Sequence, residues 1–333
     1  MTFESILADL QQKKYLPIYF LMGDEPYFID QITNYIAQNV LKEEEKAFNQ
    51  TVLYGKDIDI GNLINTAKRY PMMAPYQVVV VKEAQNIRNI DDLVYYAQNP
   101  LKSTILVVNY KYKTLDKRKK LVKEIEKKGV LFESKKLYND KLPDWITKYL
   151  KTRGFQIQPT AALLLSEFLG SELSKIVMEL DKLMLILPKE EKLITSVHIE
   201  DNIGISKDYN NIELQNALVK KDHLKAYRIV EHFNQNQKDN PFVVTIGTLY
   251  SFFNKIIVYY FLQDKSKQSV ATALKIHPFF VADYQNAARV FPPKKAVEII
   301  SLLREYDLKS KGVRNVSASP GDLLKELVYK ILN

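Results

Sequence analysis

The amino-acid sequence predicts an α/β domain with a parallel sheet, followed by helical domains. Over residues 1–140, short apolar runs alternate with segments of helical periodicity, a pattern typical of a parallel sheet covered by helices. From Pro143 onward the strand signals nearly vanish, and apolar residues recur at helical spacing. We therefore predict an α/β domain over 1–140, a small helical domain over 141–208 and a helical C-terminal domain over 209–333.

The predicted strands are the apolar runs of the first domain. They span 16–22, 49–54, 77–81, 104–108 and 130–132. Four successive valines in the third run give the clearest signal, because such a run fits a strand buried on both faces. Helices are predicted at 1–14, from Pro26 onward, and at 59–70, 91–98 and 115–128, with 42–46 as an exposed helix end.

The later domains are predicted from helical periodicity alone. Helices are expected at 145–150, 160–169 and 171–187, where Pro188 ends the last of them. The polar stretch 204–211 marks the boundary to the C-terminal domain. Beyond it, helices are predicted at 212–220, 223–233, 241–263, 270–274, 279–288, 294–310 and 322–332.

Composition narrows the class of protein. The chain has 333 residues, of which 46% are hydrophobic and 26% charged, as in an ordinary globular protein. The absence of cysteine excludes disulfides, thiolate metal sites and cysteine nucleophiles, and fits the cytoplasm. No uninterrupted apolar run of membrane-spanning length and no signal-peptide pattern occur, so we expect no membrane association. The net charge of +9 permits a polyanionic partner.

The first strand leads into a turn that has the frame of a phosphate-binding loop. Gly23 ends the apolar run, and Asp24-Glu25-Pro26 supplies a helix start with an acidic cap. Alignment with G-x-x-x-x-G-K-[ST] from Gly23 puts Phe28 on the second glycine, Ile29 on the lysine and Asp30 on the hydroxyl residue. We expect no nucleotide and no cofactor here. An ordinary strand–helix turn is the alternative.

Catalytic signatures are missing elsewhere as well. The chain contains no complete P-loop, no G-x-G-x-x-G, no G-x-S-x-G and no H-E-x-x-H. We expect its four histidines to be surface or packing residues, and we predict neither a metal site nor intrinsic catalysis.

Met72 and Met73, flanked by Pro71 and Pro75, form a candidate binding element. Adjacent residues on a helix differ by about 100°, so at least one of the two side chains is expected at the surface. Flexible thioethers suit adaptable binding surfaces. The alternative is that the pair covers the end of the sheet.

The basic segment at 111–128 is a second candidate. Its apolar residues Leu115, Leu121, Val122 and Ile125 are spaced to pack on the sheet, which leaves the lysines in water. Contacts to phosphate backbones by Lys117, Arg118 and Lys120 compete with a merely solvated face.

Eight stretches together resemble one family, the delta subunit of the bacterial DNA polymerase III clamp loader. Each is weak alone, but their order and spacing cover almost the whole chain. They are LPIYFLMGDEPYFID (16–30), PMMAPYQVVVVKEA (71–84), TILVV (104–108), DKRKKLVKEI (116–125), GSELSKIVMELDKLML (170–185), IELQNALVKKD (212–222), HPFFVADYQNAARVF (277–291) and LLREYDLKSKG (302–312).

The resemblance implies an AAA+-like domain without a working ATP site, a helical lid and a C-terminal collar. It implies that the hydrophobic pair, here Met72 and Met73, grips the sliding clamp (beta) and opens one ring interface. The family often has leucine or phenylalanine there. The implied partners are ATP-binding loader subunits and delta-prime in a hetero-oligomeric ring, and primed DNA through the assembled loader.

Three questions stay open from the sequence. The face formed by Leu323, Leu324, Leu327, Val328 and Ile331 fits either a domain core or a collar interface. A stand-alone nucleic-acid-binding protein is an alternative, because of the basic segment and the net charge. A delta-prime-like subunit is another, against which stands the absence of cysteine-rich zinc spacing and of an arginine-finger motif.

Overall fold

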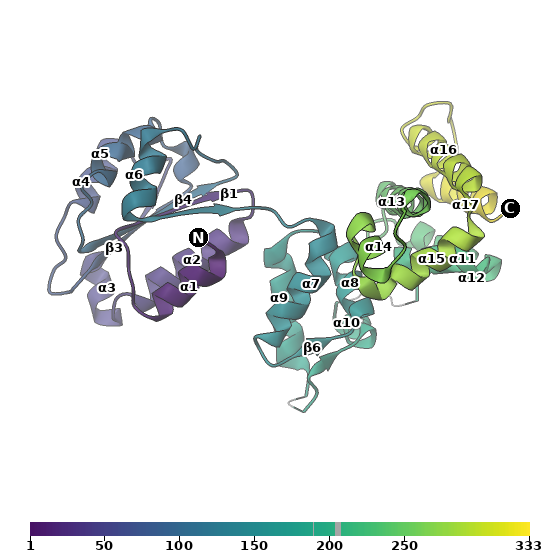
Figure 1. Ribbon diagram of the computed structural model, residues 1–333, viewed down its shortest axis with the longest axis horizontal. Helices are drawn as coiled ribbons and strands as arrows, with labels where there is room; N and C mark the ends of the chain where they lie inside the picture. Colours follow the sequence, from purple (N-terminus) through teal and green to yellow (C-terminus); the bar gives the residue numbers. More distant parts are fainter. Residues whose placement is uncertain (189, 204–207) are drawn as a thin grey trace. The chain divides into compact units, whose positions relative to one another are not determined.

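A five-stranded parallel sheet is the centre of the first of two units in the computed structural model (Figure 1). The units comprise Met1–Leu137 and Tyr138–Asn333. The structure describes residues 1–188, 190–203 and 208–333, so residues 204–207 of the predicted boundary lie outside the described residues. The proposed division of the second part at residue 208 stays a prediction.

All five predicted strands are confirmed. They are β1 (Ile18–Gly23), β2 (Gln50–Tyr54), β3 (Gln77–Lys82), β4 (Thr104–Lys111) and β5 (Val130–Ser134). The sheet order is β2-β3-β4-β1-β5, and each neighbouring pair is parallel. Strand β1 therefore lies between two other strands, and all six of its residues are buried, which explains its unbroken apolar sequence.

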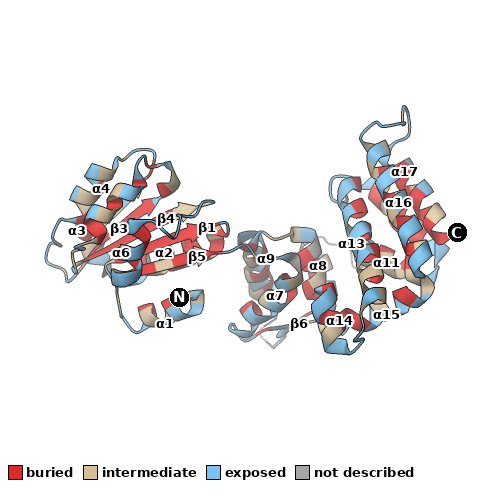
Figure 2. Ribbon diagram, turned by 45° about the horizontal axis from the view of Figure 1, so that its top comes forward, coloured by how far each residue is buried: buried red, intermediate tan, exposed pale blue. Residues whose placement is uncertain are grey.

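Helices cover both faces of this sheet. Alternate residues of a strand point to opposite faces, so Phe20 and Met22 pack on one side while Tyr19 and Leu21 pack on the other. The first side is covered by α4 (Ile60–Ala67), α5 (Val94–Ala97) and α6 (Lys120–Lys128), and the second by α1 (Phe3–Gln11) and α2 (Pro26–Asn39). Figure 2 shows the buried residues concentrated on the strands and on the inner sides of these helices.

Two predicted helix boundaries were wrong because side chains compete with the helical pattern. The basic helix begins at Lys120 and not at residue 115, since the Asp116 carboxylate accepts a hydrogen bond from the backbone N–H of Arg118 (2.9 Å) and holds a turn. The predicted helix 59–70 ends at Ala67, where its last carbonyl groups meet the Gln77 side chain.

A separate helix, α3 (Glu43–Asn49), stands where the sequence predicted only an exposed helix end. Its start is fixed by the Glu45 carboxylate, which accepts a hydrogen bond from the backbone N–H of Lys42 (2.9 Å). The predicted helix 91–98 is a 3-10 turn (Ile90–Leu93) that runs into α5.

The second unit is mostly helical, as predicted. Its helices are α7 (Leu142–Lys151), α8 (Pro159–Leu169), α9 (Leu173–Ile186), α10 (Ser196–Ile203), α11 (Asn211–Lys220), α12 (His223–Gln235), α13 (Phe242–Phe261), α14 (Lys267–Leu274), α15 (Val281–Val290), α16 (Pro293–Ser310) and α17 (Pro320–Leu332). The short strands β6 (Gln156–Ile157) and β7 (Leu193–Ile194) pair in parallel. The sequence predicted neither these strands nor α10.

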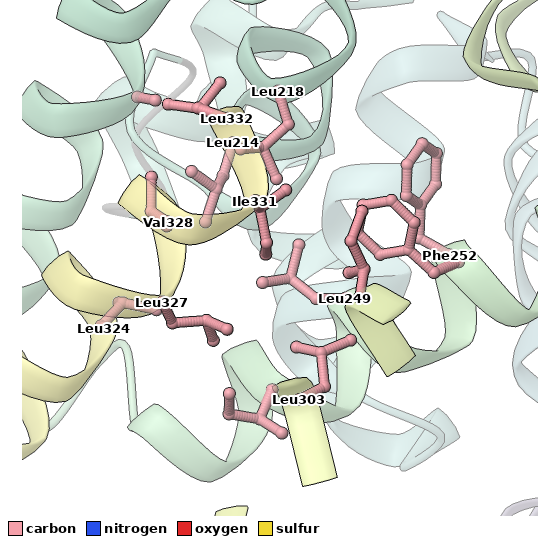
Figure 3. Close-up of a cluster of buried hydrophobic side chains, with 14 of the residues drawn as sticks. Leu214, Leu218, Leu249, Phe252, Leu303, Leu324, Leu327, Val328, Ile331 and Leu332 are labelled. Atoms are coloured by element: carbon pink, nitrogen blue, oxygen red, sulfur yellow. The ribbon is translucent and has the colours of Figure 1, made fainter. Parts of the chain in front are cut away.

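The structure places the apolar face of α17 in the core of this unit. Leu323, Leu324, Leu327, Val328 and Ile331 are at most 3% exposed and pack with residues of α11, α12, α13 and α16. Figure 3 shows α17 side chains beside Leu214 and Leu218 of α11. The question left open by the sequence is thereby answered in favour of the core.

By length and composition, one helix among the described residues could cross a membrane. It is α13, with a hydropathy of 1.4 over its most apolar window. A third (33%) of that window is buried, including Leu249, Phe253 and Ile256, which lie in the same helical core.

Candidate functional site

The turn after β1 brings three parallel strands together at their carboxyl ends. Gly23 lies in register with Lys111 of β4 and with Ser134 of β5. Its φ is +122°, and a Cβ there would come within 2.1 Å of the Ser134 carbonyl oxygen. Glycine is therefore required by close packing of two backbones, with no need to invoke a ligand.

The first turn of α2, where a P-loop binds phosphate, is capped by a carboxyl group of the chain itself. Glu25 is 4% exposed, and its Oε1 accepts a hydrogen bond from the backbone N–H of Tyr27 (3.1 Å). The Ser134 hydroxyl donates to the Glu25 carbonyl oxygen (2.6 Å) and fixes the turn. A helix N-terminus favours an acidic group, and here the Glu25 side chain of the same chain fills that position. The predicted acidic cap is confirmed.

The residues aligned with the rest of the P-loop pattern are also packed or ion-paired within the chain. Phe28 packs on Phe3 of α1, with ring centroids 4.8 Å apart, and Ile29 is fully buried. Asp30 forms an ion pair with Lys111, with Oδ1 and Nζ 2.6 Å apart. Within the described ranges no group of three or more histidine or acidic residues could hold a metal ion.

Met72 and Met73 lie in an irregular loop of residues 68–76 that joins α4 to β3. We call this segment the methionine loop. Met72 is 60% exposed and Met73 is 98% exposed, so both side chains, and not only one, face solvent. The sequence predicted that the preceding helix would run to residue 70, but it ends at Ala67, five residues before Met72, because its final carbonyl groups lie against the Gln77 side chain.

Contacts with neighbouring residues hold both ends of this loop in place. At its start, the side-chain amide nitrogen of Gln77 lies within hydrogen-bond distance of the carbonyl oxygens of Thr66, Ala67 and Arg69. At its end, Tyr76 packs edge-to-face on Tyr15, with ring centroids 5.5 Å apart. The loop therefore presents its two methionines from a fixed base.

A buried asparagine holds the middle of the methionine loop. The Asn49 amide nitrogen donates to the Met72 carbonyl oxygen (2.9 Å), and the Met72 N–H donates to Asn49 Oδ1 (2.6 Å). The next residue, Met73, has a φ of +53°, a left-handed conformation that is uncommon for a residue with a side chain.

The basic candidates are mostly engaged within the chain. Lys117 Nζ lies 2.9 Å from Glu133, which raises the pKa of Lys117 and lowers the pKa of Glu133 through the same hydrogen bond. Arg118 binds the Asp116 carboxylate through Nε and Nη2. Lys120 alone of the three candidates makes no ion pair with a described residue.

Sequence reasoning missed the two amides, Asn49 and Gln77, that shape the methionine loop. Both were read as the first residue of a strand. For Gln77 a signal exists: a polar amide directly before an apolar run lies at the buried end of the sheet and needs partners. Asn49 is followed by Gln50 and Thr51 and carries no such signal.

Comparison with known proteins gives one consistent result. The family model described as DNA polymerase III, delta subunit, matches residues 19–135. The DNA polymerase III subunit delta of Bacillus subtilis (strain 168) is 28% identical over 319 residues, which cover 92% of this chain and 91% of that protein. A solved structure, the Bacillus subtilis DNA clamp loader delta protein (YqeN), matches with a TM-score of 0.57 and 26% identity over 99% of each chain.

Proposed function

We propose that this chain, which is similar over nearly its full length to the DNA polymerase III subunit delta of Bacillus subtilis, binds and opens the sliding clamp. The single observation that carries this proposal is the methionine loop, where two exposed thioethers stand on a fixed backbone. Fully burying a methionine side chain stabilises a complex by about 1.5–3 kcal/mol. Two such side chains suffice for a small anchor.

The mechanism is differential binding. A ligand shifts a conformational equilibrium only as far as it binds one state better than the other. We propose that Met72 and Met73 occupy an apolar pocket of the clamp that is more favourable when one ring interface is open. The fixed backbone supports this role, since a loop that adapted to both forms would discriminate less between them.

The first unit has an AAA+-like fold, and we propose that it neither binds nor hydrolyses ATP. Glu25 occupies the helix start that a phosphate would need, and Asp30 is paired with Lys111. A phosphate would meet the carboxyl group of Glu25 at the helix start, and the position of the P-loop lysine holds the uncharged Ile29. The energy for the loading cycle would then come from ATP-binding partner subunits.

The remaining partners follow from a role in the clamp-loader complex. We propose that the chain assembles with ATP-binding subunits and with delta-prime in a hetero-oligomeric ring in the cytoplasm, and that it meets primed DNA through that assembly. Residues 141–208 would be the lid and 209–333 the collar. Stand-alone binding to nucleic acid is less well supported, because Lys117 and Arg118 already hold carboxylates.

The proposal is tested by titrating the purified chain with sliding clamp, and separately with ATP and Mg²⁺. We expect the clamp to bind without nucleotide and ATP to give no binding signal. Failure to bind the clamp would overturn the proposed function, and saturable ATP binding would overturn the account of the turn at Gly23. Tight, salt-sensitive binding to DNA by the chain alone would favour the nucleic-acid alternative.

A further inference from the structure

Asn49 lies where three elements of the first unit meet. It is the last residue of α3, it directly precedes β2, and its side chain reaches across to the methionine loop. The residue is 4% exposed, so it offers almost no surface to a partner. Any effect of Asn49 on binding must therefore pass through the residues that it holds.

The hydrogen bonds of this side chain are directed at one residue of the loop. Oδ1 accepts from the Met72 N–H, and Nδ2 donates to the Met72 carbonyl oxygen and to the Glu45 carbonyl oxygen (3.1 Å). The amide thus pairs with both backbone groups of Met72, as a neighbouring strand would. The bond to Glu45 fixes the amide itself against α3.

The position of Met73 shows why such a hold matters. A left-handed backbone is uncommon for a residue other than glycine, and the surrounding structure has to hold it. Asn49 fixes the peptide groups on both sides of Met72, which sets the direction in which the chain enters Met73. Without this restraint the loop is free to relax to commoner backbone conformations.

We propose that Asn49 is a positioning residue that keeps the methionine loop in its binding-competent conformation. The proposal rests on the proposed function, since it assigns Asn49 to the same clamp-binding site. The apparent dissociation constant rises in inverse proportion to the population of competent loop. If loss of the amide lowers that population to about a tenth, clamp binding weakens about tenfold with both methionines still present.

The test is a thermodynamic cycle on the full chain. Clamp affinity is measured for the wild type, for Asn49→Ala, for Met72→Ala/Met73→Ala and for the triple variant. We expect Asn49→Ala to weaken binding about tenfold, and to have no further effect once the methionines are gone, because residues acting through one contact are not additive. An equal tenfold loss in both backgrounds would overturn the inference.

A matched control separates positioning from simple loss of stability. Thr33→Val removes a buried hydroxyl of the same unit that donates to the Asn109 side chain (2.8 Å), far from the methionine loop in sequence. We expect it to lower the unfolding midpoint while leaving clamp affinity unchanged. If Thr33→Val weakens clamp binding as much as Asn49→Ala does, the effect of Asn49 is general destabilisation and the inference is wrong.

A second readout follows the loop directly. The Met72 N–H is bonded to Asn49 in the wild type, so its hydrogen exchange is slowed, and Asn49→Ala should accelerate it while amides of β3 remain protected. Unchanged exchange at Met72 would overturn the inference. The outcomes remain distinct from failure of the proposed function: if the methionine double variant binds as the wild type does, the site itself is wrongly assigned.

Discussion

Two turns of the first unit contrast in how their polar and apolar groups are satisfied. In the turn at residues 23–30, the chain supplies its own anion, its own ion pair and its own packing, and leaves little for a ligand. In the methionine loop, Asn49 and Gln77 hold the backbone while the two methionine side chains lie in solvent. The methionine loop thus combines a fixed backbone with exposed apolar side chains, as the proposed clamp-binding role requires, whereas the turn at residues 23–30 satisfies both its backbone and its side chains within the chain.

Exposure alone does not make this distinction. On α9, Met178 is 59% exposed and Leu185 is 86% exposed, values that approach those of the methionine loop. Both are ordinary positions on a regular helix. What distinguishes the methionine loop from α9 is that its exposed side chains stand on an irregular backbone held by the side-chain amides of Asn49 and Gln77.

The largest expected effect is on the stability of the turn at residues 23–30. Gly23→Ala would drive a methyl group into the Ser134 carbonyl oxygen at a φ of +122°, so we expect the free energy of unfolding to fall by about 3 kcal/mol or more. Urea-induced unfolding measures this. Gly154→Ala is the control, because φ there is +76° but no atom lies within 4 Å. Equal losses for both variants would show that packing against Ser134 is unimportant.

The next effect concerns the methionine loop. Met72→Ala/Met73→Ala should weaken clamp binding by about 2 kcal/mol or more, roughly 30-fold in the dissociation constant, as expected for anchor residues. Stability should hardly change, since both side chains are exposed. Surface plasmon resonance on immobilised clamp measures the affinity. Met178→Ala/Leu185→Ala truncates comparably exposed side chains and should bind normally; a matching loss in this control would refute the assignment.

A smaller effect on stability is expected from removing the Glu25 side chain that caps α2. Glu25→Ala removes the carboxylate that caps α2 and should lower the free energy of unfolding by about 1 kcal/mol. Asp24→Ala, at the exposed neighbouring residue, should cost less. Isothermal titration with ATP and Mg²⁺ should still give no binding to Glu25→Ala, because Ile29 is buried and uncharged. Nucleotide binding by this variant would show that the carboxylate alone kept the site empty.

The smallest expected effect is on DNA binding, where a basic residue paired within the chain is compared with one that makes no ion pair with a described residue. Lys120 makes no ion pair with a described residue, whereas Lys117 holds Glu133. If the assembled loader contacts DNA here, Lys120→Gln should reduce the slope of log affinity against log salt by about 1, and Lys117→Gln should change it less. Fluorescence anisotropy with primed DNA across a salt series measures both. A larger change for Lys117→Gln would contradict the expectation that the lysine without an ion pair among the described residues contributes more to DNA binding.

The sequence predicted the architecture well because strands buried on both faces appear in it as unbroken apolar runs. The valines at 78–81 and the run that forms β1 indicated strands buried on both faces, and their alternation with helical segments indicated a parallel sheet. The strand order β2-β3-β4-β1-β5 was not predicted. Glycine followed by an acidic cap correctly predicted the turn into α2. These signals are local, so one sequence suffices to read them.

What the sequence did not predict depends on contacts between distant residues. Nothing near Asn49 indicates that its amide will meet Met72, which is 23 residues away along the chain. The early end of α4 depends likewise on Gln77 of the following strand. The two-residue strands β6 and β7 are too short to show any periodicity. The location of the methionine pair was therefore predictable, while its support was not.

The near-complete exposure of Met73 has a chemical consequence. Thioethers in solvent are oxidised to sulfoxides, which are polar, whereas Met22 of β1 is fully buried against the helices that cover the sheet and is shielded from oxidants. A chain without cysteine has only methionine sulfur to oxidise. Oxidant would thus convert the outermost sulfur first, replacing an apolar side chain by a polar one while the folded core stays intact.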